Sequence, residues 1–184
     1  VKRLEQDADA MHKLEARIGI KQNQSKWQVM ADFPGPGRRL NITRFESMAA
    51  AKWPRARVGP VVKHLGVYYE RGGGNAVEVA ARLTAARVAW TRMGRLWTSW
   101  SIPIGIRKLA YVTLVKNSLV SALGTRVLLL GEHKQLERAQ MGWLRVLLVG
   151  GARSSTNEVV RASPRCPTVS SSLRVARLHM LQRV

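Results

Sequence analysis

Cysteine and acidic residues are scarce in this sequence. Its 184 residues include one cysteine, Cys166, and 11 acidic residues. A single cysteine excludes an intrachain disulfide framework and any zinc site built on cysteine pairs. Asp7 and Asp9 are two residues apart, so on a helix they do not face each other and make no metal-binding pair. The four histidines are scattered without the paired spacing of a metal site. The sequence therefore predicts no metal site and assembles no catalytic triad or acid–base pair.

Long hydrophobic runs are missing as well. The most apolar stretch, residues 109–131, is interrupted by Lys116 and Arg126. It falls short of the roughly 18 uncharged apolar residues of a membrane span, so we interpret it as a core helix. The charged residues Lys2, Arg3 and Glu5 at the start are unlike a signal peptide. We therefore predict no membrane partner.

Positive charge is abundant. Lysine and arginine total 31, the formal net charge is +20, and 46% of the residues are hydrophobic. The hydrophobic fraction is that of a folded chain, and the bases lie inside patterned segments and form no tail. A folded body with this charge is typical of proteins that meet phosphate groups, and it is unusual for a metabolic enzyme.

The first seventy residues have a mixed pattern. Apolar spacing predicts a helix over 3–17. The β-rich segment 27–33 predicts a short strand, which the Pro-Gly-Pro-Gly run at 34–37 ends. Residues 38–60 are poorly patterned, and we expect loop or extended structure there. Residues 61–69 are apolar, β-branched or aromatic, which predicts a second strand.

The remainder has the period of helices. Apolar residues recur every three or four positions, most clearly at Val79, Leu83, Ala86, Trp90, Met93 and Trp97. We expect both tryptophans in the core. The pattern predicts helices over 76–100, 105–123, 132–148 and 157–162, and a last helix capped by Ser170 to Ser172. The expected fold class is α+β and mostly α, with short antiparallel strands followed by a helical bundle.

Three segments carry a more specific pattern. The first, Gly19 to Met30, reads Gly-Ile-Lys-Gln-Asn-Gln-Ser-Lys-Trp-Gln-Val-Met. The second, Val62 to Val67, reads Val-Lys-His-Leu-Gly-Val. The third, Glu78 to Met93, has the spacing Glu-Val-x-x-Arg-Leu-x-x-Ala-x-x-Ala-Trp-x-x-Met. In this order they resemble motif D, motif E and the first thumb helix of reverse transcriptases from non-LTR (LINE-like) retrotransposons. Trp27 stands where that family usually has threonine, and the family's Tyr-Gly-x-Glu-x-Trp block corresponds to 123–128 without its acid and tryptophan.

The resemblance implies three parts: the C-terminal edge of a reverse-transcriptase palm at 1–70, a thumb-like helical bundle at 71–151, and a C-terminal helical extension at 152–184. It also implies a fragment of an RNA-directed DNA polymerase that holds the primer–template duplex. The family's Asp-Asp hairpin lies before motif D, and this chain does not contain it. We therefore expect the chain to be inactive by itself, although the parent protein is an enzyme.

The same resemblance implies the site residues. Lys26 corresponds to the motif D lysine, near the leaving pyrophosphate, as a proton donor or charge stabiliser. On a helix that continues to residue 100, Arg87 and Arg95 would share a face, with Arg92 beside it. The expected nucleic-acid-binding residues are Lys63, Arg82, Arg87, Arg92, Arg95, Lys108, Arg174 and Arg177.

The expected partners are an RNA–DNA or DNA duplex and the rest of the reverse transcriptase chain. The parent enzyme would use magnesium, and this chain would hold no cofactor. The resemblance implies the nucleus or cytoplasm of a eukaryotic host. Two other functions stay open: a stand-alone basic nucleic-acid-binding module, and a helical protein–protein adaptor with an acidic partner.

Overall fold

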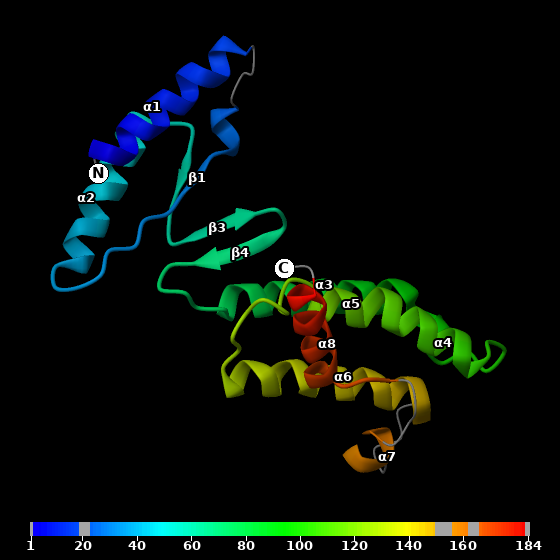
Figure 1. The fold of residues 1–184 in the computed structure, drawn as a ribbon. Helices are drawn as coiled ribbons and strands as arrows, with labels where there is room; N and C mark the ends of the chain where they lie inside the picture. The colour runs from blue at the N-terminus through cyan, green and yellow to red at the C-terminus, as the bar shows by residue number, and fades with distance from the viewer. Residues whose placement is uncertain (1, 19–22, 150–155, 162–165, 183–184) are drawn as a thin grey trace. The chain divides into compact units, whose positions relative to one another are not determined.

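The computed structural model describes residues 2–18, 23–149, 156–161 and 166–182, in two units, Val1–Gly74 and Asn75–Val184 (Figure 1). The start of the motif D segment, Gly19 to Gln22, lies outside the described residues. So does residue 162, the last of the helix expected over 157–162. The division falls four residues after the expected boundary at 70, and the described helices of 152–184 belong to the second unit.

The fold class is α+β and mostly α, as expected. Helices dominate both units, and the strands form two short pairs. None of the helices within the described ranges combines the length and the apolar character needed to cross a bilayer.

The first unit begins with helix α1, Lys2–Arg17, which confirms the expected helix. A single 3₁₀ turn, η1, covers Gln24–Lys26. Strand β1 is only Gln28–Val29, and it pairs in parallel with β2, Arg57–Val58. The expected strand over 27–33 was therefore too long. The segment has the composition of a strand, but a strand also needs a neighbouring strand to bond with. Beyond Val29, the described residues supply no such neighbour.

The expectation of loop or extended structure over 38–60 was wrong. Residues Arg38–Lys52 form helix α2, which buries Ile42, Phe45 and Ala49. Only these three positions mark the inner face, and the polar and basic residues around them dilute the helical period. The helix ends at Lys52, because the next residue, Trp53, precedes Pro54 and is therefore disfavoured in the helical conformation.

The expected second strand over 61–69 is a hairpin of two strands. Strands β3, Val61–His64, and β4, Val67–Glu70, pair antiparallel. Leu65 and Gly66 form the turn with φ angles of 48° and 82°. Two successive left-handed residues match the twist of the flanking strands. Because the turn has only two residues, the apolar pattern of 61–69 is nearly continuous and resembles that of a single strand.

The second unit begins with helix α3, Ala76–Met93, followed by the 3₁₀ turn η2, Gly94–Trp97. The expectation of one helix to residue 100 was therefore wrong. Gly94 leaves the helical region, with φ 39° and ψ −109°, which a side chain would disfavour. The break separates Arg95 from the arginines of α3.

A second helical segment is continuous but irregular. Helix α4, Ile104–Ala110, continues as a π-helical stretch η3, Tyr111–Lys116, and ends as α5, Asn117–Val120. It confirms most of the expected helix over 105–123, which was too long at its C-terminal end because a turn begins at Ser121 and Ala122 adopts φ 61°.

Helix α6, Leu130–Val149, and the short helix α7, Asn157–Arg161, confirm the remaining predictions. The last helix, α8, spans Val169–Leu181 and packs against both α5 and α6 (Figure 1). Its cap is not Ser170 to Ser172. The Thr168 hydroxyl oxygen accepts a hydrogen bond from the Ser171 amide, because a cap must precede the first helical turn.

The core of the second unit joins all of these helices. Leu83, Tyr111, Leu119, Leu136 and Leu173 are among its buried members. The expectation for the tryptophans is confirmed in the same cluster. The Trp97 indole stacks on that of Trp90 with ring centroids 4.5 Å apart, and its Nε1 donates to the Trp90 carbonyl oxygen at 2.8 Å.

Candidate nucleic-acid interface

Lys26 is an exposed residue at the end of turn η1. Its amide donates to the Asn23 carbonyl oxygen at 2.9 Å, and the Asn23 side chain accepts from the Ser25 amide at 3.2 Å. These bonds hold a local turn that presents the lysine to solvent. Within the described ranges, no three His, Cys, Asp or Glu side chains gather as a metal site requires.

Two acids of the first unit, Asp32 and Glu46, form ion pairs with arginines. Asp32 lies 2.7 Å from the guanidinium of Arg38 and also accepts from the Gly72 amide. Glu46 lies 2.5 Å from Arg71. These carboxylates hold the loops around α2 together, which is a structural use.

Lys63 lies on strand β3 and is exposed. Its ammonium lies 5.2 Å from the centre of the Tyr68 ring, on the paired strand. Its amide donates to Oε1 of Gln28. The hairpin therefore holds this base over an aromatic ring.

Arg82 faces a buried acid on its own helix. Glu78 is 1% exposed, and the Arg82 Nε donates to its Oε1 at 2.5 Å. Removing either partner would leave a charge in a largely buried place, so this pair belongs to the internal structure of α3.

The other arginines expected at the interface do not form a row. Arg87 and Arg92 are both exposed. They are five residues apart, which places them about 140° apart around a regular helix. Arg95 lies in η2, after the break at Gly94. The expected shared face of Arg87 and Arg95 rested on an unbroken helix, and the helix is broken between them.

Lys108 lies on α4 near the thiol of Cys166. Burial raises the pKa of that thiol, and the positive charges of Lys108 and Lys116 act in the opposite direction. Burial also lowers the pKa of Lys116, which is 7% exposed. Desolvation raises the pKa of the neighbouring Tyr111 phenol on the same helical segment. Lys108 is thus at the edge of a buried cluster.

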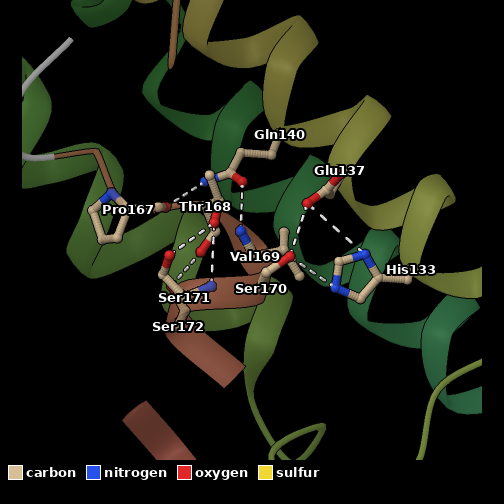
Figure 2. A network of polar contacts seen from close by, with 9 residues as sticks. All are labelled: His133, Glu137, Gln140, Pro167, Thr168, Val169, Ser170, Ser171 and Ser172. Atoms are coloured by element: carbon tan, nitrogen blue, oxygen red, sulfur yellow. Dashed lines mark hydrogen bonds and ion pairs between the residues drawn. The ribbon is translucent and has the colours of Figure 1, made fainter. Parts of the chain in front are cut away.

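Helix α8 is fastened to α6 by polar side chains (Figure 2). Gln140, 2% exposed, donates to the Pro167 carbonyl oxygen and accepts from the Val169 amide, both at 2.9 Å. The Ser170 hydroxyl donates to Oε1 of Glu137 at 3.0 Å and lies 3.1 Å from Nε2 of His133. The Gln140 side chain thus gives an acceptor to the Val169 amide, which lies at the start of α8 where no intrahelical bond reaches it.

The two expected bases of α8 differ in use. Arg177 donates to the carbonyl oxygens of Gly124 and Arg126, so it holds the turn that precedes α6. Arg174 is exposed and lines a cavity of about 310 Å³ together with His133 and Ser170. Of this pair, Arg174 is the one that remains available to a ligand.

Sequence reasoning missed three bases on the outer face of α6. Lys134 and Arg138 are exposed, and Arg145 is half-buried and donates to the side-chain oxygen of Asn157 on α7. Together they line a groove of about 300 Å³. Their spacing of four and seven residues, which places them on one side of a helix, is the signal in the sequence that marks them.

Comparisons with protein-family models, curated proteins and solved structures gave no match for this chain.

Proposed function

We propose that this chain is the palm-edge and thumb part of a LINE-like reverse transcriptase, and that it holds the primer–template duplex. The proposal is carried by the order of three motifs on a chain of net charge +20. Val62 to Val67 falls on the β3–β4 hairpin, and Glu78 to Met93 falls on α3. These positions support the resemblance, since the family expects a strand and a helix there.

In this proposal the chain contributes binding and no chemistry of its own. Nucleotide addition in such enzymes uses carboxylates that hold two divalent ions around the incoming phosphate. Asp32, Glu46 and Glu78 are engaged with arginines and do not fit a magnesium site. Lys26 would act only in the parent enzyme, where an exposed ammonium near the leaving pyrophosphate stabilises its charge.

The test is a salt titration of binding to a 20-base-pair RNA–DNA hybrid, with polyglutamate of equal charge as the control. Each neutralised phosphate adds roughly 0.9 to the slope of log affinity against log salt on duplex DNA. We expect a steep slope on the hybrid and weaker binding to polyglutamate. Equal or tighter binding to polyglutamate would instead favour the adaptor with an acidic partner.

Primer extension gives a second readout of the same proposal. With template, nucleotides and magnesium, the chain alone should give no product above background. Templated incorporation by a clean preparation would contradict the proposal. An in-frame Tyr/Phe-x-Asp-Asp motif encoded within about fifty residues before Val1 distinguishes the polymerase part from a stand-alone binding module.

A further inference from the structure

Helix α6 carries three bases in line, two exposed and one half-buried. Successive residues of a helix are about 100° apart, so Lys134, Arg138 and Arg145 fall within about 40° of one another. Leu136 and Leu147, which are buried in the core, lie nearly opposite. The bases therefore form a row on the solvent side, and the row is about 17 Å long at a rise of about 1.5 Å per residue. We call Lys134, Arg138 and Arg145 the α6 row.

The α6 row lines a groove and is not spread over a convex surface. The groove has a volume of about 300 Å³, and its lining also includes Met141, Glu137 and Asn157. Met141 is 8% exposed and continues the line between the second and third bases. Arg145 keeps its place through its bond to Asn157, which directs part of its guanidinium before any ligand arrives.

The one acid in the lining, Glu137, is engaged by residues of α6 and α8. Oε1 of Glu137 accepts from Ser170 and lies 3.8 Å from Nδ1 of His133 (Figure 2). These contacts draw the carboxylate toward α8. Lys134 and Arg138 make no side-chain hydrogen bond or ion pair with any residue that the structure describes. The groove therefore has an excess of positive charge that is not used internally.

We propose that the α6 row binds the phosphate backbone of a nucleic acid. This deepens the proposed function and rests on it, because it names the surface of the second unit that the duplex meets. One strand of a duplex presents a phosphate about every 3.4 Å along the axis, so a row of about 17 Å faces roughly five of them. The arginines add planar donor groups that match phosphate oxygens. Because the contacts are to backbone, binding is independent of base sequence.

The experiment compares two double variants of the full chain. K134A/R138A removes two exposed bases from the α6 row. R87A/R92A removes two exposed bases from α3, in the same unit, so it matches K134A/R138A in charge and exposure. It differs because Arg87 and Arg92 lie on different sides of their helix. Binding to the 20-base-pair hybrid is measured by fluorescence anisotropy over a range of salt concentrations, after circular dichroism has shown that both variants are folded.

We expect K134A/R138A to weaken binding and to lower the salt slope by about 1.8, the contribution of two phosphates. R87A/R92A should lower the slope by less than half as much. A further pair isolates the third base: R145A should weaken binding, whereas N157A, which keeps the charge, should change it less. Hybrids of two unrelated sequences should give the same losses.

Three results would overturn the α6 row as the binding surface. One is an unchanged salt slope for folded K134A/R138A. Another is an equal loss in both double variants, which would mean that binding follows total charge. The third is competition by inorganic phosphate at millimolar concentration as effective as that by the hybrid, which would mean a site for a small anion. The proposed function survives each of these if the parent chain still prefers the hybrid to polyglutamate, and it fails separately if that preference is absent.

Discussion

Helices α3 and α6 both bury one face in the core of the second unit, yet they use their charged residues differently. On α3, Arg82 forms an ion pair with the buried Glu78, and the exposed Arg87 and Arg92 lie on different sides of the helix. On α6, the acid Glu137 accepts a hydrogen bond from Ser170 of α8, and the three bases stand in line along the groove. The comparison teaches that counting bases on a helix does not locate a binding surface. The ones that matter are those left over after internal partners are satisfied.

The largest expected effect comes from removing the aromatic contact between α3 and the turn η2 that follows it. Trp97 is 2% exposed and stacks on Trp90. Trp97→Ala should reduce the free energy of unfolding by about 3–5 kcal/mol, the usual cost of deleting a buried aromatic side chain. Chemical denaturation measures it. The matched control is Trp100→Ala, because Trp100 is 91% exposed and its loss should change stability by less than about 0.5 kcal/mol.

The corresponding test of α6 concerns the side chain that fastens α8. Gln140→Ala leaves the Pro167 carbonyl and the Val169 amide without their partner. We expect a loss of about 2 kcal/mol, because unsatisfied buried groups keep their desolvation cost. Gln135→Ala, an exposed glutamine on the same helix, is the control and should be nearly neutral. A neutral result at Gln140 would mean that its two hydrogen bonds do not stabilise the position of α8.

The smallest effect sharpens the contrast between buried and exposed cations. Lys116, on the π-helical segment packed against α3, has a pKa lowered by burial. Below its ordinary pKa the unfolded chain therefore binds more protons at this residue, so its contribution makes stability rise as the pH increases toward about 10. Lys116→Met should raise the free energy of unfolding at pH 7, by less than the loss expected for either Trp97→Ala or Gln140→Ala. The gain in stability over the parent should shrink as the pH rises.

The difference between parent and variant is the quantity to measure for Lys116. Burial raises the pKa values of Cys166 and Tyr111, and these groups make stability fall at high pH in both proteins. Subtracting the two curves removes most of that contribution. A variant that is less stable than the parent at pH 7 would show that the ammonium has a favourable role in the core.

Much of the second unit was predictable because its signal is local. The apolar period that marks Val79, Leu83 and Ala86 continues through several turns and places the same residues in the core. The start of the last helix was missed by a few residues, because three serines and Thr168 are all competent caps. In the first unit, α2 was missed because three inward residues, Ile42, Phe45 and Ala49, are too few to stand out from their polar neighbours.

The sequence by itself determined the mostly helical α+β class, the positive charge and the core tryptophans, because each follows from composition or from spacing within one segment. Tertiary structure alone decided which bases are available. The Arg177 contact with Gly124 spans more than fifty residues, and the Ser170 bond to Glu137 spans more than thirty. No local pattern reports such contacts. They depend on where helices meet, and they engage some charged side chains in hydrogen bonds while leaving Lys134 and Arg138 exposed.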